Sequence, residues 1–443
     1  SDNGYTCFNK NHQNVTSVIR SFNRALAARL IASNYQPKLR YEDDDAWTEV
    51  LPDVFVYSAF LEKTRSGTWQ IRSVGIVRRD LAAIRQTPVD IQCLIDAGTV
   101  IDLAKVELTL IADSHNRAYT AAFFTCPVEL PSQVKASRRV SFAIRLRLNV
   151  TRPKWVKIHK TGKTSVKLCS VCVKPIYDKF NELSLITEFI GYYTSMGVSR
   201  FDLYISDVSR GTQLLLSRLR GHSGTLIKLH RWNLKVDKAY IWYKGQLAAI
   251  QDCIYRSWSF SEYVIIVDFD EFLVPKKKRT ILEALLVIES RTGKNLLGSM
   301  VVQNQFFCTE YPYNSALLRQ KPPLLSQITS AREATPWKHY ARSKYIMRPN
   351  ATIAGGVHYV LEHHPGVQEL LIPMDEMVLH HYRTCCGLLK RTDAWLGSSS
   401  HEVLQNEKVE VDKSMYAFST NLVRSDAVLF VKRLLQRPVT RTL

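Results

Sequence analysis

The chain has 443 residues, 46% of them hydrophobic, which is enough for two or three domains with cores of their own. Lysine and arginine number 60 against 40 acidic residues, so the formal net charge is +20. Because the basic residues are spread along the whole chain, they favour a diffuse positive surface over a nucleic-acid groove. The sequence contains no run of 18 apolar residues and therefore predicts no membrane span.

Cysteines and glycosylation triplets favour the secretory pathway. Asn-x-Ser/Thr triplets begin at Asn14, Asn149 and Asn350. Of the nine cysteines, Cys169 and Cys172 form a lone Cys-x-x-Cys pair without the second pair of a zinc site, and a few disulfides are the simpler interpretation. Because the chain begins at Ser1, we expect a signal or membrane anchor to lie outside this sequence.

The first third of the chain has the pattern of one helix followed by a sheet. Residues 15–34 have helical character, and later segments rich in Val, Ile, Phe and Tyr alternate with polar turns. Short strands at this spacing are typical of an antiparallel sheet or sandwich. We predict an N-terminal helix plus β-rich domain over residues 1–155, with a basic linker at 154–167.

From residue 156 to 443 the sequence predicts a second domain in which strands and helices alternate. Expected strands cover residues 166–175, 200–207, 224–232 and 263–275, and expected helices cover 181–198 and 238–258. This alternation predicts an α/β fold with a mostly parallel central sheet. Such domains bind ligands outside the carboxyl ends of their strands.

One of these strands ends in acidic residues. An apolar run from residue 263 leads directly into Asp268, Asp270 and Glu271. On an extended strand residues two apart point to the same side, so Asp268 and Asp270 can converge on one ligand. Paired carboxylates suit Mg²⁺ or Mn²⁺, which also bind substrate phosphates. A D-x-D triplet arises about once by chance in such a chain, and a structural cap or salt bridge is the alternative.

Six blocks carry a resemblance to a known family. They lie at residues 171–207, 245–256, 263–275 (YVIIVDFDEFLVP), 343–349 (SKYIMRP), 355–360 (GGVHYV) and 379–383 (LHHYR). In this order they resemble glycosyltransferase family 92, whose best-known animal members are β-1,4-galactosyltransferases. The resemblance spans roughly residues 168–385 and leaves the N-terminal 150 residues unexplained.

The resemblance implies a GT-A type nucleotide-sugar-binding domain. The implied reaction is an inverting, metal-dependent transfer of galactose from UDP-galactose in β-1,4 linkage to a sugar on a glycan chain, such as an N-glycan. The implied cofactor is Mn²⁺, and the implied partners are the nucleotide-sugar donor and the glycan acceptor. The implied location is the Golgi lumen, with attachment to the membrane only through an anchor outside this chain. The oligomeric state stays open.

The family pattern also implies roles for single residues. Asp268 and Asp270 are expected to hold the metal, and His381 is the candidate third ligand; a satisfied core or surface histidine is the alternative. Residues expected at the nucleotide sugar are Asp207, Gln246, Asp252, Lys344, Arg348 and Arg383. For each of these, a local pair or a solvated charge is the plainer interpretation.

An inverting transfer needs a carboxylate that takes the proton of the acceptor hydroxyl. Glu310, two residues beyond an apolar run, is the first candidate. The other candidates are Glu333, Glu362 and Asp375.

Two other classes of protein stay open at this point. A haloacid-dehalogenase-type phosphatase also places D-x-D after an apolar strand, but it wants a small residue where this chain has Phe272. A non-catalytic glycan- or polyanion-binding protein would use the β-rich N-terminal region instead.

Overall fold

The computed structural model describes most of the chain. The described residues are 10–33, 36–42, 45–64, 66–80, 91–96, 101–113, 115–128, 139–144, 153–161, 168–222, 225–385 and 409–436. Asn149 and residues 162–167 of the predicted linker lie outside them. Among the helices described, none combines the length and the apolar character that crossing a membrane requires.

The N-terminal region forms a nine-stranded sheet with the order β5-β4-β8-β9-β2-β3-β7-β6, and β1 pairs with β2. Its neighbours are antiparallel except for the parallel pair β2 and β9. The strands are β1 (Thr48–Leu51), β2 (Val54–Lys63), β3 (Trp69–Arg78), β4 (Ile91–Asp96), β5 (Ile101–Lys105), β6 (Glu107–Leu110), β7 (Tyr119–Val128), β8 (Arg139–Ile144) and β9 (Val156–Lys160).

The second sheet has seven strands in the order β12-β11-β10-β13-β18-β15-β21. Parallel pairing joins β12 to β11, β11 to β10, β10 to β13 and β15 to β21, while β18 is antiparallel to both of its neighbours. The strands are β10 (Leu168–Cys172), β11 (Arg200–Ile205), β12 (Leu226–Arg231), β13 (Ser261–Ile266), β15 (Leu297–Val302), β18 (Lys344–Met347) and β21 (Gln368–Ile372). The expected α/β organisation is confirmed.

Helices connect and cover these strands. The longer ones are α4 (Leu183–Ser195), α5 (Arg210–His222), α6 (Gln246–Ser257), α7 (Ile281–Thr292) and α11 (Asp426–Gln436). The short ones are η2 (Trp242–Lys244), η3 (Leu317–Arg319), α8 (Leu325–Ile328), η4 (Pro349–Ala351), η5 (Ser414–Phe418) and α10 (Ser419–Val423). Strand β11 is buried along its whole length, as expected for a parallel strand that is covered on both faces.

Three smaller sheets complete the fold. A three-stranded sheet has the order β14-β22-β16, with β14 (Glu271–Pro275), β22 (Met377–Arg383) and β16 (Asn304–Cys308). The two-stranded sheets pair β17 (Ala331–Glu333) with β23 (Val409–Val411) and β19 (Thr352–Gly355) with β20 (Val360–His363).

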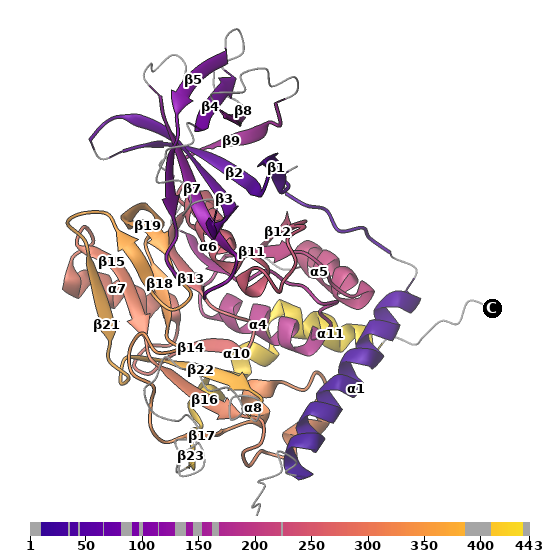
Figure 1. Ribbon diagram of the computed structural model, residues 1–443. Helices are drawn as coiled ribbons and strands as arrows, with labels where there is room; N and C mark the ends of the chain where they lie inside the picture. The colour runs from indigo at the N-terminus through magenta and orange to yellow at the C-terminus, as the bar shows by residue number, and fades with distance from the viewer. Residues whose placement is uncertain are drawn as a thin grey trace, which may run out of the picture.

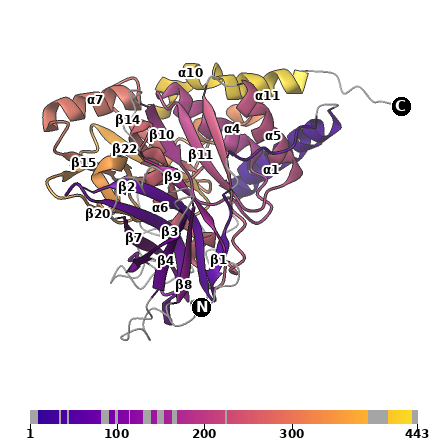
Figure 2. The same cartoon turned by 90° about the horizontal axis from the view of Figure 1, so that it is seen from above.

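The two large sheets share one hydrophobic core. Figure 1 shows the N-terminal sheet standing over α6, and Figure 2 shows the same contact from above. The indole of Trp232, which follows β12, has its ring centroid 4.6 Å from that of Tyr57 in β2 and 5.0 Å from that of Trp47. Because the sheets are joined by these large buried rings, the N-terminal sheet is packed directly on the α/β part.

The N-terminal helix α1 (Lys10–Ala32) does not pack with the sheet that follows it. It lies against α4, α5 and α11 (Figure 1). Leu26 and Leu30 of α1 are fully buried in the core that those helices form. In space the helix therefore belongs with residues 156–443, and the division of the chain into domains at residue 155 stays a prediction.

Leu26→Ala tests the packing of α1. Removing three buried carbons leaves a cavity between helices, and we expect the free energy of unfolding to fall by about 2–5 kcal/mol. Ile31→Ala on the same helix is the matched control, because Ile31 is 50% exposed, and we expect it to change stability by less than about 0.5 kcal/mol. Denaturant unfolding of both variants checks this. Equal effects would contradict the placement of α1.

Candidate active site

The candidate site lies at the carboxyl ends of the parallel strands. Strand β13 ends at Ile266, and Asp268 and Asp270 follow in a turn in which the N–H of Glu271 donates to the carbonyl of Asp268 at 3.1 Å. The expectation that strand alternation brings the two carboxylates together is therefore wrong. The turn before β14, and not an extended strand, sets their relative position.

Two lysines flank Asp268. The Nζ of Lys174 lies 3.2 Å from Oδ2 of Asp268, and the Nζ of Lys344 lies 3.3 Å from the same oxygen. Burial opposes ionisation of Asp268, but the two ammonium groups outweigh burial and hold the pKa of this carboxyl below its usual value. Its other oxygen, Oδ1, is buried without a hydrogen-bond partner among the described residues.

Glu271 lies under this turn and connects its parts. Its Oε2 accepts the N–H of Asp268 at 2.7 Å and is 3.3 Å from Nζ of Lys344, and its Oε1 is 3.4 Å from Nδ1 of His381. Burial raises the pKa of the Glu271 carboxyl, and Lys344 opposes that rise. Glu271 thus fixes the backbone of the turn and the side chains of both Lys344 and His381.

The strand pairing brings His381 to the site. In the antiparallel register of β14 and β22, His381 lies opposite Glu271. Its Nε2 is 3.4 Å from Oδ2 of Asp270, and its ring lies 5.0 Å from that of Phe306. Among the groups around Asp270, His381 contributes most to holding the pKa of that carboxyl low against the effect of burial.

His380 points the other way. Its ring stacks on Phe307 at 4.2 Å, and its Nε2 is 3.9 Å from Asp412. Burial lowers the pKa of His380 to about 3, so this imidazole is neutral at physiological pH. The two neighbouring histidines therefore face opposite sides of β22, as alternate residues of a strand do.

The structure separates Lys344 from Arg348, although both lie in one sequence block. Strand β18 runs antiparallel to β13, so Lys344 lies at the carboxyl end of β13 and Arg348 at its beginning. The guanidinium of Arg348 pairs with Glu262 at 2.8 Å and donates to the carbonyl of Lys294. The expectation that Arg348 belongs to the site is wrong, because the strand carries it to the opposite edge of the sheet.

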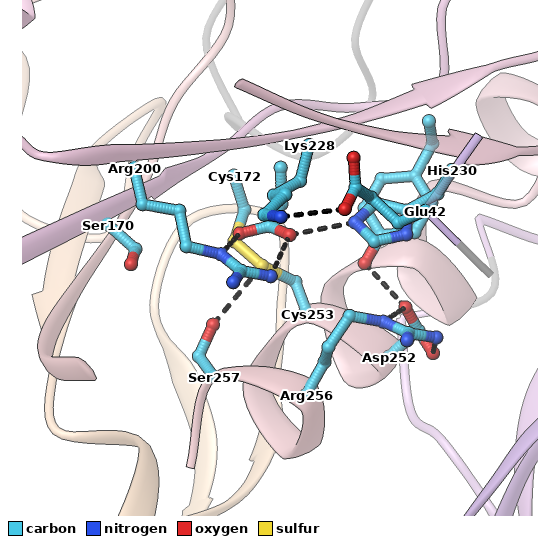
Figure 3. A network of polar contacts seen from close by, with 12 residues as sticks. Glu42, Ser170, Cys172, Arg200, Lys228, His230, Asp252, Cys253, Arg256 and Ser257 are labelled. Carbon is cyan, nitrogen blue, oxygen red and sulfur yellow. Dashed lines mark hydrogen bonds and ion pairs between the residues drawn. A yellow bond between two sulfur atoms is a disulfide. The ribbon is translucent and has the colours of Figure 1, made fainter. Parts of the chain in front are cut away.

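Asp252 belongs to a buried polar network beneath α6 (Figure 3). It accepts hydrogen bonds from Ser58 at 2.5 Å, from Tyr204 at 2.6 Å and from Arg256 at 2.9 Å. Its side chain is fully buried between α6 and the N-terminal sheet. The expected contact of Asp252 with a nucleotide is therefore wrong, and the alternative of a local pair describes it.

The remaining predicted residues of the nucleotide site are more dispersed. Asp207 is exposed just beyond the end of β11, at the same sheet edge as Asp268. Gln246 is buried as the first residue of α6. Arg383 ends β22, close enough to Asp270 to help lower the pKa of that carboxyl.

The candidate bases lie in different places. Oε2 of Glu310 accepts the N–H of Cys385 at 3.2 Å, just beyond the carboxyl ends of β16 and β22. Glu333 accepts the backbone N–H of Phe306, the residue whose ring contacts His381, at 2.8 Å. Glu362 lies in β20. Asp375 is an exposed partner of Lys277 at 2.5 Å.

Three residues of the cluster received no role in the sequence analysis: Lys174, Glu271 and His358. Lys174 follows the end of β10 by two residues, as Asp268 follows the end of the adjacent strand β13, and this shared position is the signal that could have found it. His358 lies in one of the family blocks, and its Nδ1 donates to the carbonyl of Ser343 at 2.9 Å. Burial lowers the pKa of His358 to about 3, and Lys344 contributes to this.

The donor set of Asp268, Asp270 and His381 fits a divalent metal. A buried carboxylate oxygen with no internal hydrogen bond among the described residues is available on Asp268, and an imidazole nitrogen lies beside Asp270. In the described part of the chain, the sets whose ligand atoms all lie within 4.8 Å of one another are Cys172, Asp202 and Cys253, and Cys308, Glu310 and Cys385. Asp268, Asp270 and His381 share the donor chemistry of a metal site but are not such a set. Disulfides join the cysteines of each set, so neither is a metal site.

Carboxylates, lysines and a histidine gather at the carboxyl ends of the parallel strands, the edge at which α/β domains bind ligands, and their charges suit a charged ligand. Comparison with known proteins identifies the class. Residues 167–426 match the model of glycosyltransferase family 92. The chain belongs to this family.

Individual relatives are distant. The β-1,4-galactosyltransferase galt-1 of Caenorhabditis elegans is 25% identical over 191 residues, 43% of this chain and 42% of that protein. A family 92 protein of Oryza sativa subsp. japonica is 23% identical over 255 residues, 53% of this chain and 40% of that protein. The chain thus spans about two-fifths of the length of these curated relatives.

Solved structures resemble the chain only weakly. HddC from Yersinia pseudotuberculosis is 8% identical with a TM-score of 0.27, covering 48% of this chain and 93% of that one. Residues 1–349 of TarS from S. aureus, in complex with UDP, are 11% identical with a TM-score of 0.26, covering 60% of this chain and 69% of that one. At these TM-scores the likeness supports no conclusion about fold or ligand.

Asp252→Asn and Asp207→Asn separate a structural carboxylate from a candidate ligand-binding one. We expect Asp252→Asn to lower the free energy of unfolding by about 3–5 kcal/mol, because it leaves the buried Arg256 without its main counter-charge. Asp207 is exposed, so Asp207→Asn should leave stability within about 0.5 kcal/mol and raise the KM for the sugar donor. Denaturant unfolding and transfer kinetics check both. A stable Asp252→Asn protein with a raised donor KM would reverse the assignment.

Proposed function

We propose that this chain is an inverting, metal-dependent galactosyltransferase that moves galactose from UDP-galactose in β-1,4 linkage to a sugar of a glycan chain. Membership of family 92 supports sugar transfer, and the name of the Caenorhabditis elegans relative supports galactose and the linkage. The observation that carries the proposal is the cluster in which Asp268, Asp270 and His381 meet Lys174 and Lys344. We assign the seven-stranded sheet and its helices to a GT-A type domain on this basis.

Asp268, Asp270 and His381 are the residues that would hold Mn²⁺. When bound there, the metal supplies a Lewis acid beside the diphosphate of the donor. An imidazole ligand favours Mn²⁺ over Mg²⁺, because its nitrogen is softer than the oxygen ligands that Mg²⁺ prefers.

Lys174 and Lys344 supply fixed positive charge for the donor diphosphate. Burial disfavours the charged form of each lysine, but neighbouring carboxylates outweigh burial, and the pKa of both lysines is raised. Both ammonium groups are therefore charged at neutral pH and lie against one oxygen of Asp268. Arg383 adds a third positive charge near Asp270. Positive groups held in place bind the diphosphate without reorganising, in the ground state and the transition state alike.

We assign the general base to Glu310. It lies beyond the carboxyl ends of β16 and β22. This is the side of the cluster that holds His381 and Arg383, and Lys174 lies on the other side. A carboxylate there would take the proton of the acceptor hydroxyl from the side opposite the departing UDP.

The disulfides support an oxidising compartment. They join Cys93 to Cys126, Cys172 to Cys253 and Cys308 to Cys385. Such bonds persist in the secretory pathway and not in a reducing cytosol. We propose the Golgi lumen as the place of action, with a glycan acceptor as the partner.

Release of UDP from UDP-galactose tests the proposed function. We expect Mn²⁺-dependent release and transfer to a terminal sugar within a panel of simple acceptors, read by mass spectrometry. EDTA should abolish transfer and added Mn²⁺ should restore it. Asp270→Asn should reduce kcat/KM by about 100-fold or more with an unchanged melting temperature, because the substitution keeps shape and removes charge.

Controls on the donor accompany this experiment. UDP with Mn²⁺ should raise the melting temperature of the wild-type protein, since a ligand of the folded state stabilises it. Full activity after exhaustive dialysis against EDTA would refute the metal role. Equal stabilisation by GDP would refute UDP as the nucleotide.

His381→Ala and His380→Ala form a matched pair. His381 faces Asp270, so its loss should raise the Mn²⁺ concentration for half-maximal activity by about tenfold or more. His380 stacks on Phe307 away from the cluster, so its loss should lower the melting temperature and leave the Mn²⁺ requirement unchanged. Titration of activity with Mn²⁺ and thermal unfolding check the pair. The same Mn²⁺ requirement in both variants would overturn the role of His381.

A further inference from the structure

We propose that the N-terminal sheet completes the donor site, because its β6–β7 loop holds the two lysines of the cluster in place. The loop is described at residues 111–113 and 115–118. This inference rests on the proposed function, since it assigns the loop a part in binding the nucleotide-sugar donor. It gives the N-terminal region a role that neither the family match, which begins at residue 167, nor the relatives provide.

A row of rings leads from the loop to the first lysine. The imidazole of His115 stacks on the indole of Trp242, with centroids 4.0 Å apart and planes at 21°. Trp242 meets the ring of Tyr243 edge to face at 4.7 Å. The Nζ of Lys174 lies 5.0 Å from the centre of the Tyr243 ring and 3.2 Å from Asp268. Each contact is of a kind that attracts, so the position of the loop is transmitted to Lys174.

The segment that carries these rings adopts an unfavourable backbone. Tyr243 has φ 39°, Lys244 has φ 57° and Gly245 has φ 88°, directly before α6. Tyrosine and lysine rarely enter the left-handed region, and surrounding contacts must hold them there. The loop supplies some of them, because Arg117 lies with its guanidinium 5.7 Å from the Trp242 ring and donates to the carbonyl of Ala239 at 3.1 Å.

The same loop reaches the second lysine from the other side. The carboxylate of Asp113 pairs with His115 at 3.1 Å, and the nearby backbone N–H of Val357 offsets part of the rise that burial causes in the pKa of Asp113. The next residue, His358, donates to the carbonyl of Ser343, which directly precedes Lys344. One loop of the N-terminal sheet is thus connected to both Lys174 and Lys344.

The consequence is that donor affinity depends on the loop. Lys174 is one-third exposed, and without the ring behind it the ammonium is free to take other rotamers. A loop that only packs would contribute to stability alone. A loop that positions the lysines contributes to the binding of the diphosphate in the ground state and the transition state alike. Loss of the loop contacts should therefore raise KM and leave kcat little changed.

His115→Ala, His115→Phe and Leu110→Ala test the inference. His115→Ala removes the ring on Trp242, and we expect the KM for UDP-galactose and the Kd for UDP with Mn²⁺ to rise about three- to tenfold, with kcat within about twofold of wild type. His115→Phe keeps a stacked ring and loses the pair with Asp113, and it should restore most of the affinity. Leu110→Ala is the control, because Leu110 is 41% exposed in β6 just before the loop.

A second variant covers the case in which His115→Ala unfolds. Tyr243→Leu, at a ring that is 39% exposed, keeps bulk but removes the face that Lys174 meets, and the donor KM should rise by a similar factor. A folded His115→Ala or Tyr243→Leu protein with wild-type KM and Kd would overturn the inference, as would a His115→Phe protein as impaired as His115→Ala. If the wild-type protein binds no UDP, both proposals fall. If the wild-type protein binds UDP and the variants bind it with equal affinity, the role of the loop is refuted and the proposed function stands.

Discussion

The pairing of buried charge at the turn between β13 and β14 is the constraint on which the site depends. Isolated carboxylates at this depth would be neutralised by protonation, because burial raises their pKa. Here Lys174 and Lys344 keep Asp268 ionised, and Glu271 secures the turn from beneath. Keeping these carboxylates and lysines charged costs desolvation free energy. Such costly groups are common at functional sites. The cluster is arranged so that a diphosphate and a metal would enter a region already charged.

The fold explains how residues so far apart in the chain come together. Lys174 follows β10, Asp268 follows β13 and Lys344 begins β18, so three neighbouring strands deliver their ends to one sheet edge. His381 lies in β22 of the three-stranded sheet, and β22 pairs with β14, the strand that follows the turn. Parallel strands place their carboxyl ends together by geometry alone, which is why this edge is the usual binding edge of α/β sheets.

Features that depend on a local sequence pattern could be predicted. Features that depend on the direction of a strand in the sheet, or on which element packs against a helix, could not. The acidic residues at the end of an apolar run and His381 in a recognisable block could be predicted, but the turn that interrupts the expected strand 263–275 could not. Lys344 and Arg348 stand in one block, but only the antiparallel direction of β18 decides which end meets Asp268. Helical spacing showed that α6 has a buried face, yet not that the N-terminal sheet covers it, so Asp252 could not be recognised as a structural carboxylate.

The placement of α6 ties the two large sheets into one unit. Its outer face is covered by the N-terminal sheet, its Asp252 is bonded to Ser58 of β2 and Tyr204 of β11, and its first turn follows the strained Tyr243. A displacement of the N-terminal sheet would therefore move α6 and the segment with Tyr243 that precedes it. Close-packed interiors transmit such shifts instead of absorbing them. The family blocks begin only at β10, but the geometry of the residues within them depends on a sheet that lies outside them.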